Sequence, residues 1–309
     1  MKISDIAIVV FTYGRLEHTK ITLDALSSNE NFEQYPVFIY SDGPKAGHEE
    51  KVKSVRIFLK EFKEKHSNIK VIERKNNIGL EKSIVSGITE ILRRYPAVIV
   101  IEDDIRTSKV FLKYMSRMLN LYADNKKIGS VTGFCYSQDR MKIPKDYQYD
   151  IYFAPRTCSW GWATWRDRWD NIDWDVKDIN EFIKDKGRQR EFNKGGNDLS
   201  KMLIAQAKKG IDTWDIQWCY HNFKYNRFTI YPTVSYVENI GMDGTGVHCG
   251  RTSGFRNDSL NERLPKRIPK GFNMDAQILK NFKKSTNFTL KMFIELSIYR
   301  LYKIIQSIL

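Results

Sequence analysis

Three consecutive acids, Glu102, Asp103 and Asp104, are the residues whose types and spacing most clearly suggest chemistry in this 309-residue chain. They directly follow an apolar run, residues 97–101, that is typical of a buried strand. Carboxylates crowded at a strand end repel one another unless a cation or positive side chains offset their charge. Oxygen ligands suit Mg²⁺ or Mn²⁺, and such an ion could hold a diphosphate leaving group. The alternative is that Asp103 or Asp104 caps a helix near Ser108.

Short β-branched runs alternate with stretches of helical spacing in the first third of the chain. We expect strands at residues 6–11, 36–40, 69–72 and 97–101, helices at 16–26, 51–66 and 80–95, and later a strand at 128–134, a helix at 200–209 and a strand at 228–237. The early alternation predicts an α/β fold with a mainly parallel sheet covered by helices on both faces. Ligands of such sheets bind outside the carboxyl ends of the strands.

A polar segment follows each of the first four predicted strands. The segments are Thr12-Tyr13-Gly14-Arg15, Ser41-Asp42-Gly43-Pro44, Arg74-Lys75-Asn76-Asn77 and Glu102-Asp103-Asp104. Because the carboxyl ends of parallel strands meet at one edge of a sheet, we expect these segments to converge there. The sequence therefore predicts one polar site built from separate parts of the chain.

The second half of the chain is rich in tryptophan. Aromatic faces can pack against the C–H surfaces of sugars, and a glycine lets the backbone approach a ligand closely. On these grounds Trp160, Gly161 and Trp162 are interpreted as a sugar-binding loop. The alternative is that the rings form a core, which is our interpretation of Trp165 and Trp169 at their helical spacing.

The order of these motifs resembles that of GT-A glycosyltransferases, and most closely that of the N-acetylglucosaminyltransferase I-like family, with the family 2 transferases behind it. The motifs are Phe11-Thr-Tyr-Gly-Arg15, Tyr40-Ser-Asp42, Asn77-Ile-Gly-Leu-Glu-Lys82, Val100-Ile-Glu-Asp-Asp104, Trp214-Asp215 and Gly244-Thr-Gly-Val-His248. Each motif is common by itself, and their shared order carries the resemblance. It implies a GT-A fold, a Rossmann-like sheet that binds nucleotide-diphospho-sugars.

The resemblance also implies roles for the acidic and basic residues of the first half. Asp42 would contact the uracil or ribose of a nucleotide sugar, and Arg15 would contact the nucleotide near its phosphates. Asp104 would bind the metal ion directly. Glu102 and Asp103 would hold the sugar and ribose or surround the metal ligands.

Further roles follow from the same resemblance. Asp215 would be the catalytic base, and Thr12 and Lys82 would belong to the donor site. Trp214 would lie on the acceptor side. His248 would be a second metal ligand or a phosphate contact.

Three other acids compete with Asp215 for the role of base. They are Asp212, Asp173 and Asp175. An exposed turn position for Asp215 is the plain alternative to catalysis.

The positive charge of the chain is concentrated near its end. The net charge is +14, and residues 263–309 hold ten Lys or Arg against two acids. Residues 287–309 carry apolar side chains at three- and four-residue spacing, which predicts a basic amphipathic helix that binds an anionic membrane surface. The alternative is a helix that packs on the protein or in a dimer interface. No nucleic-acid partner is expected, because the charge lies beside an apolar stripe that nucleic acid would not need.

Cysteine spacing and hydropathy give an expected location. The cysteines, Cys135, Cys158, Cys219 and Cys249, form no C-x-x-C pair and suit a reducing compartment. We identify no secretory signal and no apolar run long enough to span a membrane. The protein is expected to be cytoplasmic and peripherally associated with the inner face of the cytoplasmic membrane.

These observations predict a GT-A catalytic domain over residues 1–250, with a nucleotide-binding half at 1–104 and an acceptor-binding half at 105–250, followed by a basic tail at 251–309. The expected activity is metal-dependent, inverting transfer of a sugar from a UDP-sugar, with UDP-GlcNAc as a candidate. The expected acceptor is a hydroxyl of a lipid-linked oligosaccharide in bacterial surface polysaccharide synthesis.

Two other functions remain open at this point. A sugar-1-phosphate nucleotidyltransferase would have a related sheet, but it usually carries a glycine-rich loop after the first strand, where Thr12-Tyr-Gly-Arg15 has one glycine. A basic nucleic-acid-binding protein ranks last, because it would need basic and aromatic residues interleaved over one face of the fold.

Overall fold

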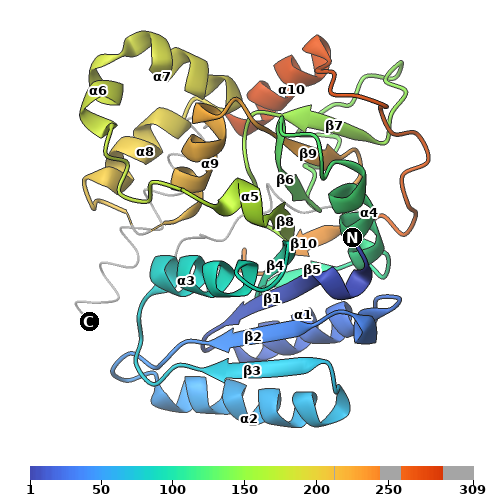
Figure 1. The fold of residues 1–309 in the computed structure, drawn as a ribbon, viewed down its shortest axis with the longest axis vertical. Coiled ribbons are helices and arrows are strands. Elements are labelled where there is room, and N and C mark those ends of the chain that lie inside the picture. The colour runs from blue at the N-terminus through green and yellow to red at the C-terminus, as the bar shows by residue number, and fades with distance from the viewer. Residues whose placement is uncertain (212, 244–258, 288–309) are drawn as a thin grey trace.

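A mixed eight-stranded sheet forms the centre of the computed structural model, which describes residues 1–211, 213–243 and 259–287 (Figure 1). Its strands are β1 (Ile6–Thr12), β2 (Val37–Ser41), β3 (Ile69–Glu73), β4 (Ala97–Glu102), β6 (Ile128–Thr132), β7 (Ile151–Ala154), β8 (Trp162–Trp165) and β9 (Phe228–Pro232). They lie in the order β3-β2-β1-β4-β8-β6-β9-β7. Strands β8 and β7 run antiparallel to their neighbours, and the other pairs are parallel. The predicted mainly parallel α/β sheet is confirmed.

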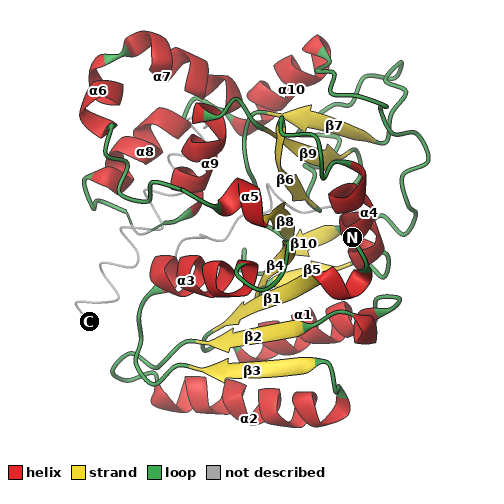
Figure 2. Cartoon of the chain, viewed as in Figure 1, coloured by secondary structure: helices red, strands yellow, loops and turns green. Residues whose placement is uncertain are grey.

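The first half of the chain follows the predicted alternation closely. Its helices are α1 (Leu16–Ser27), α2 (Glu49–Lys65) and α3 (Leu80–Leu92), with short 3₁₀ turns at Ile3–Asp5 and Phe32–Gln34. Helices α1 and α2 pack on one face of the sheet, and α3 packs on the other (Figure 2). All seven residues of β1 are buried, because helices cover both faces.

The second half departs from the prediction in two places. Strand β8 enters antiparallel beside β4, where the sequence suggested a loop followed by a helical stretch. The predicted strand at 228–237 is divided, because β10 (Val237–Asn239) leaves the main sheet and pairs with β5 (Ile105–Thr107). This small second sheet brings the segment after β10 next to the turn that follows β4.

Helices between β8 and β9 form a lobe with its own core. They are α5 (Arg166–Trp169), α6 (Ile179–Lys184), α7 (Lys186–Phe192), α8 (Leu199–Ala207) and α9 (Asp215–Lys224), with a 3₁₀ turn at Asn193–Gly195. Residues of α6 to α9 pack around Phe182, Phe192 and Leu203. Figure 1 shows these four helices gathered beside the far half of the sheet. We call α6 to α9 the helical lobe.

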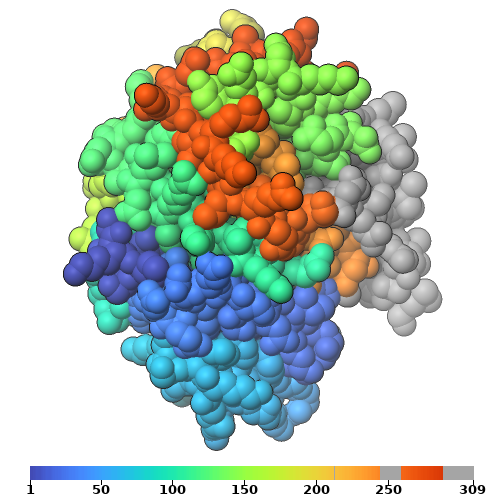
Figure 3. All heavy atoms as spheres, turned by 90° about the vertical axis from the view of Figure 1, so that its right-hand side faces the viewer, coloured from blue at the N-terminus to red at the C-terminus, as the bar shows by residue number. Residues whose placement is uncertain are grey.

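Residues 259–287 lie on the body of the protein, across the outer part of the sheet (Figure 3). Helix α10 (Ala276–Thr286) places Phe282 against the rings of Tyr152 and Tyr231. Of the predicted amphipathic helix at 287–309, residues 288–309 are outside the described residues. Within the described residues, no helix is both long and apolar enough to cross a membrane.

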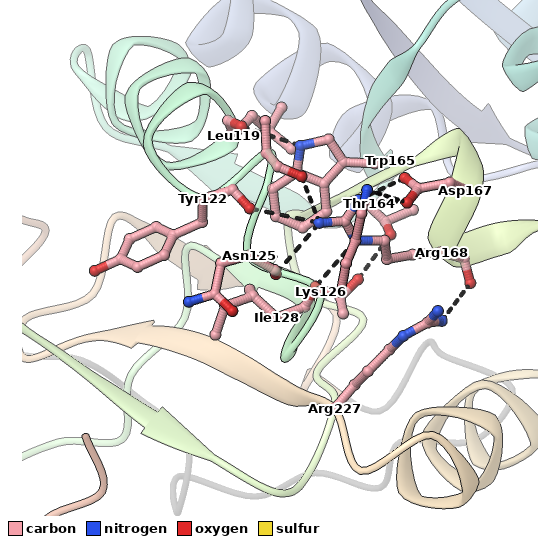
Figure 4. Close-up of polar contacts among 12 residues, drawn as sticks. Leu119, Tyr122, Asn125, Lys126, Ile128, Thr164, Trp165, Asp167, Arg168 and Arg227 are labelled. Atoms are coloured by element: carbon pink, nitrogen blue, oxygen red, sulfur yellow. Dashed lines mark hydrogen bonds and ion pairs between the residues drawn. The ribbon is translucent and has the colours of Figure 1, made fainter. Parts of the chain in front are cut away.

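A buried arginine, Arg168, fixes the turn between α4 (Phe111–Leu121) and β6 (Figure 4). Its side chain is 1% exposed. The guanidinium donates to the carbonyl oxygens of Ala123 at 2.6 Å, Ile128 at 3.2 Å and Asn125 at 3.3 Å. Asp167 balances its charge from the protein surface, 2.5 Å away. One side chain thereby donates to several backbone carbonyls of the turn and joins the end of α4 to the start of β6.

Replacing Arg168 with Met should destabilise the protein by about 3 kcal/mol, since charged hydrogen bonds to buried carbonyls are lost together. The control is Arg106→Met, because Arg106 is 49% exposed and pairs with Glu238 at the surface. That change should cost under about 1 kcal/mol. Urea unfolding measures both, and equal losses in the two variants would contradict the role given to Arg168.

Candidate active site

The carboxyl ends of β1, β2 and β4 meet at one edge of the sheet, as predicted. Glu102 is the last residue of β4, and Asp103 and Asp104 form the turn into β5. Arg15 directly precedes α1, in the connection after β1. The neighbouring strands therefore bring the triplet and Arg15 together from positions almost ninety residues apart.

Arg15 provides the positive charge beside the triplet. Its Nη2 donates to Asp104 Oδ2 at 2.9 Å and also to the carboxylate of Asp103. Burial opposes the charged form, but the two carboxylates outweigh burial and raise the pKa of Arg15 above its ordinary value. A quarter of the Arg15 side chain remains exposed, which leaves it accessible from solvent.

Glu102 is the acid of the triplet whose charged form is most disfavoured by its surroundings. Burial raises the pKa of Glu102 well above its ordinary value, and the charges of Asp104 and Asp103 raise it further. Asp215, from the start of α9, adds to the effect, while Arg15 offsets part of it. Burial likewise raises the pKa of Asp103. The edge therefore holds more negative charge than its side chains neutralise, which favours an added cation.

The donor set at this edge is suited to a divalent cation that takes most of its ligands from a substrate. No group of three or more His, Cys, Asp or Glu side chains among the described residues is arranged to hold a metal ion. Mg²⁺ commonly binds through one or two carboxylates together with substrate phosphates, and the partly exposed Asp104 fits that pattern. His248, the other predicted ligand, is outside the described residues.

The segment after β10 covers one side of Asp104. The amide of Ile240 donates to the Asp104 carbonyl oxygen at 2.8 Å. A Cβ at Gly241 would lie 2.2 Å from Asp104 Oδ2, so no larger residue fits there without a shift. His18 Nε2, in the first turn of α1, lies 3.2 Å from Asp243 Oδ2. The segment after β10 therefore contacts both Asp104 and the first turn of α1.

Asp42 lies just beyond β2, where the sequence placed it, and is 6% exposed. Its carboxylate accepts hydrogen bonds from the backbone N–H of Gly43 at 3.0 Å, the side chain of Asn77 at 3.1 Å and the backbone N–H of Ile78 at 3.2 Å. These bonds tie the end of β2 to the loop after β3. Asp42 therefore shapes this part of the edge, and its contact with a nucleotide stays a prediction.

The remaining predicted donor residues differ in exposure. Thr12 is 5% exposed, and its hydroxyl donates to the carbonyl oxygen of Tyr40 at 3.3 Å. Lys82 is exposed in the first turn of α3, where it lines a groove of about 640 Å³ with Ile78 and Trp174. Thr12 is thus part of the packed strand end, and Lys82 has the freedom to reach a ligand.

Arg56, on α2, is a positioning residue that the sequence analysis missed. Its guanidinium donates to the carbonyl oxygen of Arg74 at 2.7 Å, the hydroxyl of Ser41 at 3.2 Å and the carbonyl oxygen of Asp42 at 3.3 Å. It therefore joins the ends of β2 and β3 beside Asp42. The available signal was a lone arginine next to the apolar stripe of α2, which is too common to identify it.

Asp215 is the predicted base that the fold brings next to the acidic edge. It begins α9 and accepts a hydrogen bond from the Thr213 hydroxyl, and its negative charge contributes to raising the pKa of Glu102. Of its competitors, Asp173 accepts from the backbone N–H of Lys177, and Asp175 is exposed. The third competitor, Asp212, is outside the described residues.

The predicted sugar-binding role of Trp162 and Trp214 is wrong. Their exposed fractions are 0% and 2%, and their rings stack with centroids 5.3 Å apart. The reason is that Trp162 belongs to β8, between β4 and β6, so its ring enters the core between the sheet and the helical lobe. Neither ring has a free face for a sugar. The core role predicted for Trp165 and Trp169 is confirmed, since each is 3% exposed.

Packing also accounts for Gly161. Its φ of +56° is in the left-handed region, and a Cβ there would lie 2.8 Å from Cγ1 of Val237. The close approach that the sequence suggested is therefore made to Val237 rather than to a ligand. Trp160 is partly buried, with its ring edge-on to Phe134, and its place on the acceptor side stays a prediction.

Comparisons with known proteins give similarity at the level of structure only. No protein-family model and no curated protein sequence matches the chain. S. aureus TarS 1–349 is similar with a TM-score of 0.45 and 12% identity, over 75% of this chain and 59% of that one. Its complex with UDP-GlcNAc gives a TM-score of 0.46 and 10% identity, over 76% and 60%.

A third similar structure is the mannosyltransferase PcManGT from Pyrobaculum calidifontis in complex with GDP-Man and Mn²⁺. Its TM-score is 0.42 with 12% identity, over 72% of this chain and 69% of that one. The chain thus spans about three fifths of the length of the TarS structures. Since these similarities are distant and partial, we base the functional proposal on the geometry of the site.

Replacing Glu102 with Gln should stabilise the metal-free protein at neutral and alkaline pH. An acid whose folded-state pKa is raised binds its proton more tightly when folded, so stability falls as the pH rises above the unfolded pKa of about 4.3. Calorimetry in EDTA should therefore give Glu102→Gln a higher Tm than the parent at about pH 8, with the difference shrinking towards about pH 5. A parent Tm that matches or exceeds that of the variant at the higher pH would contradict the burial of this charge.

Proposed function

We propose that the protein is a glycosyltransferase that moves a sugar from a nucleoside-diphosphate donor to a hydroxyl group. One observation carries the proposal, namely that the acidic triplet, Arg15 and Asp42 lie at the ends of neighbouring strands, with Asp215 close enough for its charge to act on Glu102. This arrangement combines groups suited to a nucleotide and a diphosphate with a separate carboxylate from another part of the fold. The first set would bind the nucleotide-sugar donor, and the separate carboxylate would take the proton of the acceptor hydroxyl.

The donor would bind along the ends of β1, β2 and β4. Asp42 would meet the base or ribose, and Glu102 and Asp103 would meet the ribose and the sugar. Arg15 is suited to the phosphates, because its guanidinium already balances two carboxylates and is partly exposed. Lys82, exposed at the start of α3, is a second candidate for phosphate contact.

Asp104 would hold a Mn²⁺ or Mg²⁺ ion, with His248 as a further proposed ligand. Such an ion supplies positive charge to the diphosphate as it departs. Arg15 would add to that charge from the protein. The excess of negative charge at Glu102 and its neighbours supports this assignment, since a bound cation would relieve it.

Asp215 would act as the base of an inverting reaction. Its carboxylate would take the proton of the acceptor hydroxyl as that oxygen attacks the anomeric carbon on the face opposite the nucleotide. The bond from the anomeric carbon to the diphosphate oxygen would break at the same time. Thr213 holds one oxygen of Asp215, and no bond to the other oxygen is found among the described residues.

We further propose a UDP-sugar donor, with UDP-GlcNAc as the first to test, and a lipid-linked oligosaccharide acceptor in polysaccharide synthesis at the inner face of the cytoplasmic membrane. Support comes from residues 259–287, which hold seven Lys or Arg against two acids. They lie on the surface of the second half of the sheet. Such a surface would be attracted to anionic lipids.

Removing the proposed metal ligand should abolish turnover. Asp104→Ala is expected to lose sugar transfer from a panel of nucleotide sugars with Mn²⁺, and EDTA should inhibit the parent protein. The control is Asp124→Ala, which removes an exposed acid in the turn after α4 and should stay active. Full activity of the parent under saturating EDTA would remove the metal from the proposal.

Changing the base should separate binding from chemistry. Asp215→Asn should bind donor as the parent does, while its kcat falls by about 10²- to 10⁴-fold. The matched control is Asp175→Asn, at an exposed competitor, which should leave kcat unchanged. Donor titration by calorimetry and initial rates provide the two readouts. Unchanged kcat in Asp215→Asn would assign the base to another residue.

A further inference from the structure

A chain of hydrogen bonds connects α3, in the nucleotide-binding half, to Asp215 in the helical lobe. Glu81 of α3 accepts from the Gln206 side-chain amide at 3.2 Å. The side-chain oxygen of Gln206, on α8, accepts from the backbone N–H of Thr213 at 3.1 Å. The Thr213 hydroxyl then donates to Asp215. We call these four residues the relay.

Glu81 sets the orientation of the Gln206 side-chain amide in the relay. A carboxylate can only accept, so the Gln206 amide must point its N–H₂ group at Glu81. Its carbonyl oxygen is thereby presented to the Thr213 N–H, which can only donate. If Gln206 turned over, donors would face each other at Thr213 and acceptors would face each other at Glu81. The amide therefore has one orientation that satisfies both neighbours.

Because Gln206 is buried, turning its side-chain amide over would leave polar groups without hydrogen-bond partners. Gln206 is 9% exposed, so water does not readily replace a lost partner. A second buried glutamine, Gln217, donates to the other oxygen of Glu81 at 3.2 Å and is 3% exposed. Glu81 thus anchors α8 and α9 to α3 at a single carboxylate. The connection fixes the backbone that leads into Asp215.

We propose that Gln206, held by Glu81, is a positioning residue that sets the orientation of Asp215 for proton abstraction. The proposal rests on the proposed function and extends it, since it identifies what holds the base. Gln206 itself touches neither donor nor acceptor. It acts through its hydrogen bond with the backbone N–H of Thr213. The side-chain hydroxyl of Thr213 holds Oδ1 of Asp215 and leaves Oδ2 for the acceptor.

The test exchanges the carboxylate and the amide between positions 81 and 206. Gln206→Glu places two carboxylates against each other and should lower kcat by about 10²-fold, as expected for a misplaced catalytic group, while the donor KM stays within about twofold of the parent value. The double variant Glu81→Gln/Gln206→Glu should recover most of the lost kcat. In the double variant, the amide introduced at position 81 donates through its N–H₂ group to the carboxylate introduced at position 206, and its carbonyl oxygen accepts from Gln217. The carboxylate at position 206 still accepts from the backbone N–H of Thr213.

A matched control distinguishes positioning from general loss of stability. Gln189, in the helical lobe, donates to the carbonyl oxygens of Phe182 and Ile183 at 2.8 Å and is not part of the relay. Gln189→Glu should lower the Tm but leave kcat unchanged for folded protein. An equal loss of kcat in Gln189→Glu and Gln206→Glu would overturn the proposal. So would a double variant that is no more active than Gln206→Glu alone.

Hydrogen exchange at the Thr213 amide tests the relay without an assay of transfer. The amide should be protected in the parent, exposed in Gln206→Glu and protected again in the double variant. Fast exchange of this amide in the folded parent would overturn the relay itself. If the parent transfers no sugar from any donor of the panel while the amide is protected, the proposed function fails and the catalytic role fails with it, but the relay stands.

Discussion

The crowding of carboxylates at the end of β4 is the constraint on which the rest of the site depends. Glu102 ends β4 after five fully buried residues, Asp103 and Asp104 follow it, and Arg15 offsets their charge only in part. Holding them together requires β1 beside β4, so that the connection into α1 delivers Arg15. It also requires the close approach of Gly241. The parallel sheet gathers unfavourable negative charge at the point where a bound cation would relieve it, and that cation could in turn hold a diphosphate.

The sheet around this edge could be predicted because its strands are short, apolar and separated by amphipathic helices. Strand β8 and most of the helical lobe could not be predicted in the same way, the exception being α8, which lies where a helix was predicted at 200–209. Trp162 and Trp165 carry no period that distinguishes a central antiparallel strand from a loop or a helix, and a tryptophan suits both a core and a sugar site. Their burial is decided by β4 and β6, which flank β8 in space but not in sequence.

The site residues that could be predicted likewise follow local sequence patterns, whereas those that could not depend on partners distant in the sequence. Asp42 and Arg15 lie in the polar segments that follow predicted strands, so topology brings those segments to the edge. Arg56, Gln206 and Thr213 act through hydrogen bonds to residues on other elements, and a lone polar residue in a helix or turn gives no signal of such a partner. Motifs that end strands can therefore be read from the sequence, whereas the residues that orient them depend on tertiary packing.

The central claim is that this edge binds a nucleoside diphosphate through a cation. A crystal structure of the protein with UDP and Mn²⁺ would test it most directly. We expect the uridine beside Asp42, the ion on Asp104, and the diphosphate between the ion and Arg15, with Asp215 facing the open side of the phosphate. A diphosphate bound away from the ends of β1 and β4, or an ion that does not contact Asp104, would contradict the account.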